Sequence, residues 1–207
     1  HFGCVSVLTR CCSLLRATLH MDGDKQVLAD LGAARLLINA IMIHPTSTEF
    51  VLEALATLKD LAADETTRGS IDAAEAEAAI VSMLAASRYK PDVLALAFAA
   101  LNNVVVDSKT RTVASMQRPV LNCIVSSLKS YPNDQDVLKN SCLLLKSYTY
   151  NEENLLMMRE HSATLVPLLV GSSNQLSGET SERAQYIMIK LYDRYNGYSE
   201  RQKARQS

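Results

Sequence analysis

The sequence predicts an all-α fold in which similar three-helix units stack one on another. A polar phrase rich in Asp and Asn returns at Asp22, Asp64, Asp107 and Asn151, which are 42, 43 and 44 residues apart. Each copy lies between segments whose apolar residues recur at three- and four-residue steps, the period of a helix. No convincing β-strand is present, because the β-branched run at 104–106 ends a helical pattern. A fixed period of this length indicates stacked supersecondary units.

The chain opens on an apolar helix, expected at 5–20, which we assign to a partial first unit at 1–21. The outward apolar face of such a helix would be uncovered at the end of a stack. We therefore expect the sequence to be a fragment of a longer stack.

Each later unit opens with two compact helices. The short first helices are expected at 24–31, 66–73, 109–116 and 152–160. Asp or Asn side chains at their beginnings accept hydrogen bonds from the free N–H groups of the first helical turn. The second, apolar helices are expected at 34–43, 75–87, 119–130 and 163–170. Pro119 suits a first turn, where the missing N–H would have had no helical partner.

A third, longer helix completes each unit after a loop containing Pro or Gly, residues that break the preceding helix. These helices are expected at 48–62, 92–106, 136–148 and 179–195. Each carries one apolar stripe that would be buried, as Leu52, Leu55, Leu58 and Leu61 do in the first of them. The units therefore span 22–63, 64–106, 107–149 and 150–193 of a single domain at 1–207, followed by a basic tail at 194–207.

Charge and hydropathy exclude several functions. The net charge of −1 gives no general attraction to nucleic acid, and no apolar run reaches the roughly 18 residues of a membrane span. Charge is nevertheless uneven, with eight acidic and two basic residues from Glu49 to Glu77. This stretch is either a solvated face or a surface that selects a basic partner.

Catalytic and metal-binding motifs are missing from the sequence. The five cysteines include no CxxC pair, which indicates reduced, mostly buried thiols in a cytoplasmic protein. The four histidines lie in different units without a partner at metal-ligand spacing. There is no nucleophile elbow, P-loop or HExxH motif. We therefore expect a protein that is not an enzyme and binds no metal or cofactor.

The repeated unit resembles the armadillo repeat, which has a short first helix and two longer ones. The best match to that family's Ala-Leu-x-Asn-Leu phrase is Ala100-Leu101-Asn102-Asn103-Val104, with residues 57–61 and 144–148 in the same register. The segment 165–169 is similar to the family's second-helix phrase. The resemblance implies a right-handed superhelical solenoid of armadillo-type three-helix repeats. HEAT repeats are the structural alternative, and the separate short first helix favours armadillo.

In armadillo proteins the third helices line a concave groove that binds extended partner segments, so the resemblance implies a protein-binding scaffold. By register, the groove asparagine falls on Asn103, which either faces the groove or fixes a turn, or does both. The predicted groove residues are Glu53, Thr57, Asp60, Leu96, Ala99, Asn103, Asn140, Leu143 and Ser147. Importin-α-like members also carry Trp in the groove, and this chain has none, so that mode of recognising nuclear-localisation signals is not expected.

Two alternative functions remain open. The chain could be a structural subunit of a large cytoskeletal or ciliary assembly, or a regulatory armadillo segment of a larger enzyme or GTPase regulator. In every case the expected partners are proteins and the expected location is cytoplasmic, with cytoskeletal or ciliary association in the assembly alternative.

Overall fold

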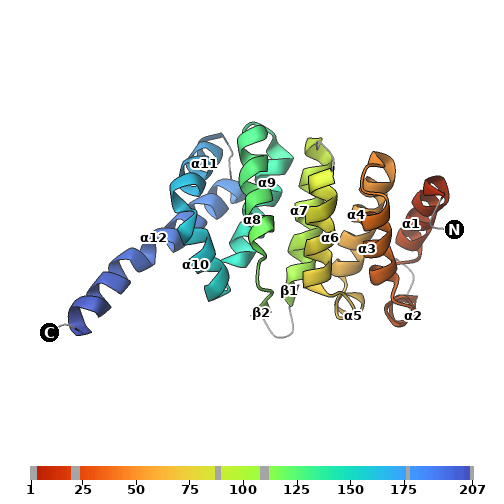
Figure 1. Ribbon diagram of the computed structural model, residues 1–207, viewed down its shortest axis with the longest axis horizontal. Coiled ribbons are helices and arrows are strands. Elements are labelled where there is room, and N and C mark those ends of the chain that lie inside the picture. Colours follow the sequence, from red (N-terminus) through yellow and green to blue (C-terminus); the bar gives the residue numbers. More distant parts are fainter. Residues whose placement is uncertain (1–3, 20–23, 87–89, 108–111, 176–177, 206–207) are drawn as a thin grey trace.

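The computed structural model describes residues 4–19, 24–86, 90–107, 112–175 and 178–205. In this part of the chain the regular structure is helical except for one antiparallel pair of two-residue strands, so the predicted all-α class is confirmed. The helices stand side by side along the long axis of the molecule, with the two termini at opposite ends (Figure 1).

The helices follow the predicted order along most of the chain. They are α1 (Val5–Thr18), α2 (Asp24–Asp30), α3 (Ala33–Ile43), α4 (Thr48–Ala63), α5 (Glu65–Arg68), α6 (Ala73–Ala86), α7 (Pro91–Val105), α8 (Arg118–Ser130), α9 (Gln135–Tyr148), α10 (Glu152–Glu160), α11 (Ser162–Gln175) and α12 (Glu179–Arg205). The strands are β1 (Val106–Asp107) and β2 (Thr112–Val113). The predicted long helices at 48–62, 92–106 and 136–148 agree with α4, α7 and α9 to within one residue at each end. The last helix, α12, extends ten residues past its predicted end at 195.

The longer helices pack in two rows. In the first, which we call the A row, α1, α4, α7, α9 and α12 each pack against the next. In the second, the B row, α3, α6, α8 and α11 do the same. Each B-row helix also packs against the A-row helix that follows it in the chain. The core is therefore a continuous apolar layer between the two rows.

Each middle A-row helix is buried along two stripes. The rear stripe, which faces the preceding A-row helix, comprises Phe50, Ala54, Thr57 and Leu61 in α4, Val93, Ala97, Ala100 and Val104 in α7, and Val137, Ser141, Leu144 and Tyr148 in α9. The front stripe, which faces the following one, comprises Val51, Leu55, Leu58 and Ala62 in α4, Leu94, Phe98, Leu101 and Val105 in α7, and Leu138, Cys142 and Leu145 in α9 with Thr149 directly after it. The Thr57 hydroxyl donates a hydrogen bond to the Cys12 carbonyl of α1 at 3.3 Å, which shows that the stripe containing Thr57 faces the preceding helix of the row. Every residue of both stripes is buried because a helix covers each side.

Ser141 is the one hydroxyl of the rear stripes that has no hydrogen-bond partner among the described residues. Alanine stands at the equivalent places in α4 and α7, at Ala54 and Ala97. A buried hydroxyl without a partner is costly, so Ser141→Ala is expected to raise the free energy of unfolding by about 1 kcal/mol. Urea unfolding monitored by circular dichroism measures this change. As a matched control, Ser127→Ala should destabilise, because the Ser127 hydroxyl donates to the Cys123 carbonyl at 2.8 Å.

The third unit departs from the prediction at its short first helix. The segment predicted as a helix at 109–116 is not helical over its described residues, and β2 at its beginning pairs with β1 in the register Val106–Val113. The amide of Ala114 also donates to the Val105 carbonyl at 3.0 Å. The expectations of a helix there and of no strand at Val106 were therefore wrong. The β-branched residues Val106, Thr112 and Val113 favour an extended backbone over a helix.

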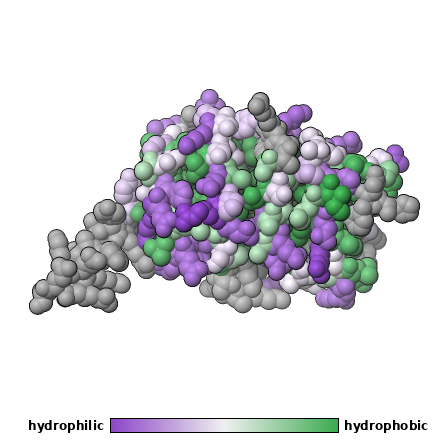
Figure 2. Space-filling view, in the orientation of Figure 1, coloured by the Kyte–Doolittle hydropathy of each residue, from purple (hydrophilic) through white to green (hydrophobic). Residues whose placement is uncertain are grey.

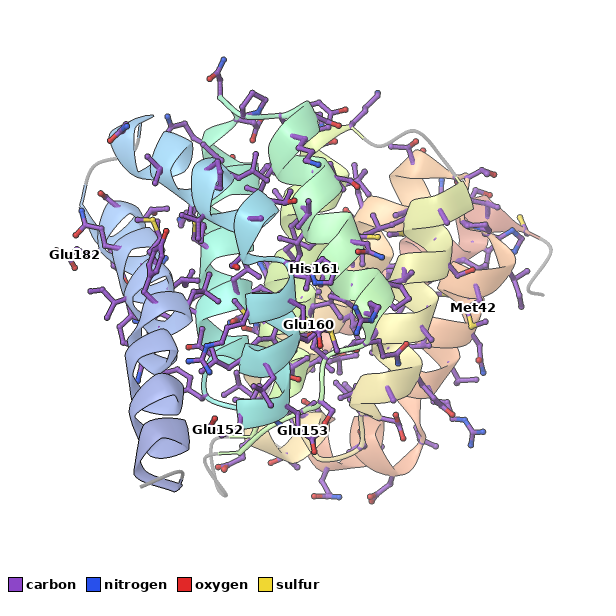
Figure 3. The ribbon with its side chains drawn as sticks, turned by 60° about the vertical axis from the view of Figure 1, so that its left-hand side comes forward. Met42, Glu152, Glu153, Glu160, His161 and Glu182 are labelled. Atoms are coloured by element: carbon purple, nitrogen blue, oxygen red, sulfur yellow. The ribbon has the colours of Figure 1, made fainter. Side chains whose placement is uncertain are left out.

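The other short helices begin where polar caps predict. Asp64 accepts from the amides of Thr66 and Thr67 before α5, and Asn151 accepts from those of Glu153 and Asn154 before α10. The α10 helix has its predicted bounds, whereas α5 ends at Arg68, five residues before the predicted end. Figure 3 shows Glu152 and Glu153 at the beginning of α10 and Glu160 at its end.

A buried carboxyl group connects the two rows. Glu77 of α6 is fully buried and accepts from the Tyr148 hydroxyl of α9 at 2.5 Å and from the Gln117 amide at 3.0 Å. Burial raises the pKa of the Glu77 carboxyl group above its ordinary value. Glu77 therefore does not belong to the acidic surface expected for this part of the sequence, and its role is to join α6, α9 and the chain before α8.

Candidate partner-binding surface

The predicted groove residues all lie on the three middle helices of the A row. Leu96 and Ala99 of α7 and Leu143 of α9 are half-buried at its surface, beside the polar Asn140. The amide group of Asn140 donates to the Asp136 carbonyl of its own helix at 2.9 Å. These four residues form the middle of one continuous helical face.

Thr57 does not belong to this face. Its side chain is fully buried, and its hydroxyl donates to the carbonyls of Glu53, at 2.7 Å, and of Cys12, at 3.3 Å. The prediction of Thr57 as a partner contact is corrected accordingly. The helical register of α4 predicted that Thr57 would lie near the groove. In the structure α1 covers this position, so Thr57 lies in the interface between α1 and α4.

Asp60, Asn103 and Ser147, which share one register position, each bond to a neighbouring A-row helix. The Asp60 carboxylate accepts from Arg16 Nε of α1 at 3.0 Å. The amide group of Asn103 donates to the Lys59 carbonyl of α4 at 3.1 Å, and the Ser147 hydroxyl donates to Asn102 Oδ1 of α7 at 2.7 Å. These partly exposed side chains thus bridge the helices of the row, and Asn103 has a structural role whether or not it also contacts a partner.

The acidic part of the face is largely neutralised within the chain. Arg16 forms ion pairs with both Glu53 and Asp60, at 3.4 and 3.0 Å, and Lys59 lies 3.7 Å from Asp60. Lys25 binds Asp64 at 2.8 Å and lowers the pKa of that carboxyl group. Half-exposed pairs of this kind contribute about 0–1 kcal/mol each, but they remove free negative charge. A surface selecting basic partners is therefore weaker here than the composition suggests.

Sequence reasoning missed an aromatic and basic patch at the other end of the face. The ammonium groups of Lys146 and Lys190 each lie 5.6 Å from the ring centroid of Tyr186, a cation–π distance. Tyr150 lies 6.3 Å from the same ring and is 62% exposed. The patch joins residues of α9 and of the turn after it to residues of α12, so only the packing of α12 on α9 brings it together. Tyr192, farther along α12, is 61% exposed.

The non-helical segment at 113–117 is held by two asparagine side chains at the beginning of α10. Asn151 Nδ2 donates to the Val113 carbonyl at 3.0 Å, and Asn154 binds both the Ala114 carbonyl and the Met116 amide, at 2.8 and 2.6 Å. Asparagine can serve a backbone in this way because its amide group is both donor and acceptor. The segment at 113–117 stands where the short first helix was predicted, and the asparagines supply hydrogen-bond partners for the Val113 and Ala114 carbonyls and the Met116 amide.

Among the described residues there is no cluster of three His, Cys, Asp or Glu side chains able to hold a metal ion. No described helix is both long enough and apolar enough to cross a membrane. Figure 2 shows polar and apolar side chains interspersed over the face in view, with apolar groups gathered toward the N-terminal end.

Comparison of the chain with protein-family models, with curated proteins and with solved structures finds no match.

Proposed function

We propose that this protein is a non-enzymatic protein-binding scaffold, built as an armadillo-type solenoid, that holds an extended partner segment along the face of its A row. The observation that carries the proposal is the unbroken succession of α1, α4, α7, α9 and α12, each packed on the next. The regular register of the buried stripes in α4, α7 and α9 supports a repeat architecture.

The dimensions of such a row suit an extended ligand. Packed helices lie about 8–10 Å apart, and an extended chain advances about 3.3 Å per residue. A partner that crosses the row would therefore present about three residues to each helix, with alternate side chains directed at the protein. The half-buried apolar side chains of Leu96, Ala99 and Leu143 offer shallow contacts at the middle of the path, and Tyr150 and Tyr186 offer larger ones at its end.

Arginine substitutions at Ala99 and Leu143 test this proposal. Both side chains are half-buried at the face, and no hydrogen bond or ion pair between helices depends on them. The double variant Ala99→Arg/Leu143→Arg is expected to lose the partners that the unchanged protein captures from cell extract, because two long cations would obstruct the path. Mass spectrometry of the captured proteins measures the loss, after circular dichroism has shown equal helicity.

The matched control is Asn122→Arg/Ser126→Arg, which adds the same two charges at exposed positions of α8 in the B row. A partner that is retained by this control and lost by the A-row variant supports the proposal. Identical partner lists for all three proteins would contradict it and place recognition elsewhere.

The second candidate is a structural subunit of a large assembly. The bonds that Asp60, Asn103 and Ser147 make within the A row favour it, because side chains at this register position are engaged inside the chain. An assembly subunit would retain its partners in both arginine variants.

A further inference from the structure

The last helix of the A row continues the face along which the proposed partner segment runs. Its buried rear stripe, packed on α9, consists of Ala184, Ile187 and Leu191. By the register of that stripe, Tyr186 holds the place of Leu143, and Lys190 holds the place of Ser147. Leu143 and Ser147 remain partly exposed although α12 packs on α9, so these places stay accessible between stacked helices. Tyr186 and Lys190 therefore belong to the face itself and not to the outer side of α12.

Two cations at this end of the face have no carboxylate partner. The ammonium groups of Lys146 and Lys190 both approach the Tyr186 ring, each at 5.6 Å from its centroid. Among the described residues, neither lysine forms an ion pair. Glu182, one turn before Tyr186, is exposed, and Figure 3 shows its side chain directed away from the other helices. The Tyr186 ring holds two like charges close together, because its electron-rich face attracts cations.

Other cations of the face are already neutralised within the chain. The ion pairs are those of Arg16 with Glu53 and Asp60, of Lys59 with Asp60, and of Arg183 with Glu179. The uncompensated positive charge is therefore gathered where α9 meets α12. A carboxylate placed between two ammonium groups offsets their mutual repulsion and accepts a charge-assisted hydrogen bond from each.

We propose that Lys146 and Lys190 bind an acidic side chain, Asp or Glu, of the extended partner segment, and that Tyr150 packs on the adjoining part of that segment. Tyr150 is 62% exposed, and its ring centroid lies 6.3 Å from that of Tyr186, so it adds apolar contact area beside the charges. This inference rests on the proposed function, because it assigns a chemistry to one end of the path along the A row. The acidic part of the segment lies over α9 and α12.

Nucleic acid is the other polyanion that lysine and tyrosine side chains bind. Proteins that bind a phosphate backbone do so with many cations arranged along a stripe. The patch supplies two, Lys146 and Lys190, and the ion pairs elsewhere on the face extend no stripe from it. A carboxylate of a protein segment is therefore the ligand that the charges favour.

Fluorescence anisotropy with three labelled peptides tests the proposal. The peptides alternate Ser with Glu, Gln or Lys and have about twelve residues, enough to cross four packed helices. The net charge of −1 gives the protein no general attraction for an acidic peptide. At low ionic strength the unchanged protein is expected to bind the Ser-Glu peptide about tenfold more tightly than the Ser-Gln peptide, and the Ser-Lys peptide more weakly still. Added salt should reduce the preference.

A pair of glutamine substitutions makes the test specific. Lys146→Gln/Lys190→Gln keeps most of each aliphatic stem and removes both charges, so it is expected to abolish the preference and weaken the Ser-Glu peptide about tenfold. The matched control is Arg35→Gln/Lys129→Gln, which removes the same charge at exposed positions of α3 and α8 in the B row. This control should bind all three peptides as the unchanged protein does, once circular dichroism has shown equal helicity.

Several results would overturn the proposal. These are equal binding of the Ser-Glu and Ser-Gln peptides, a preference that survives in Lys146→Gln/Lys190→Gln, and an equal loss in the B-row control. A single-stranded oligonucleotide that binds through the two lysines, when the Ser-Glu peptide does not, would instead assign the patch to nucleic acid.

The partner capture with Ala99→Arg/Leu143→Arg separates this inference from the proposed function. Partners lost from that variant, without any peptide preference in the unchanged protein, would leave the proposed function standing and make the assignment of Lys146 and Lys190 wrong. A lysine-dependent preference for the Ser-Glu peptide, with identical partner lists for all captured samples, would support the lysine pair and contradict the proposed function.

Discussion

Glu77→Ala is expected to lower the free energy of unfolding by about 3–5 kcal/mol, because it leaves one buried and one half-buried donor without acceptors and opens a cavity between the rows. The donors are the Tyr148 hydroxyl, at 2.5 Å, and the Gln117 amide, at 3.0 Å. Both Glu77 and Tyr148 are fully buried, so water cannot replace the lost acceptor. Urea unfolding of the two proteins at one pH measures the difference.

Two conservative variants separate the contributions. Tyr148→Phe removes one donor and keeps the aromatic packing, so it should cost about 1–3 kcal/mol. Glu77→Gln keeps an oxygen for the Gln117 amide and offers an N–H to the Tyr148 oxygen, so it should be tolerated best. If Glu77→Ala proved no more destabilising than Tyr148→Phe, the carboxyl group would not be the centre of this network.

The same carboxyl group makes stability depend on pH in a definite direction. Its pKa in the folded protein lies above the ordinary value of 4.5, chiefly because burial disfavours the charged form. The folded state therefore holds this proton more tightly than the unfolded chain does. The resulting stabilisation is complete below pH 4.5 and is lost as the pH rises through the raised folded pKa. Unfolding curves across that window should fall more steeply for the unchanged protein than for Glu77→Gln, and parallel curves would contradict this assignment.

Asn154→Ala is expected to lower the free energy of unfolding by about 2–4 kcal/mol, because it removes the two hydrogen bonds, one buried and one partly buried, by which Asn154 holds the segment before α8. Asn154 is 1% exposed, and it binds the Met116 amide at 2.6 Å and the Ala114 carbonyl at 2.8 Å. The segment is not helical, so no neighbouring backbone group replaces Asn154 as the hydrogen-bond partner of the Met116 amide and the Ala114 carbonyl. Denaturant unfolding gives the overall loss, and amide hydrogen exchange of Met116 locates it.

Glu153→Ala is the matched control for this prediction. Glu153 is the neighbouring residue and also contacts the segment, through the Ser115 hydroxyl at 3.3 Å, but both partners are exposed. Its replacement should change stability by no more than about 0.5 kcal/mol. Equal losses in the two variants would show that burial of the Asn154 amide group is not what matters.

The three middle helices of the A row could be predicted from the sequence alone. The bounds of α4, α7 and α9 were predicted within one residue, because helical periodicity and the Pro and Gly breaks are local properties of the chain. The caps at Asp64 and Asn151 were likewise readable, since each bonds to amides only two or three residues away. The buried stripes also followed from apolar residues at regular steps.

The partners of the buried and half-buried polar residues could not be predicted, because they depend on how the helices pack. Thr57 is buried because α1 covers it, and its bond to Cys12 spans 45 residues of sequence. Asn103 and Ser147 bond to helices 44 and 45 residues earlier, and Glu77 meets Tyr148 across 71. The segment at 113–117 stays non-helical because Asn151 and Asn154 of the following unit bind its backbone. A polar side chain takes the partner that packing brings within about 3 Å, and local sequence pattern does not specify which partner that is.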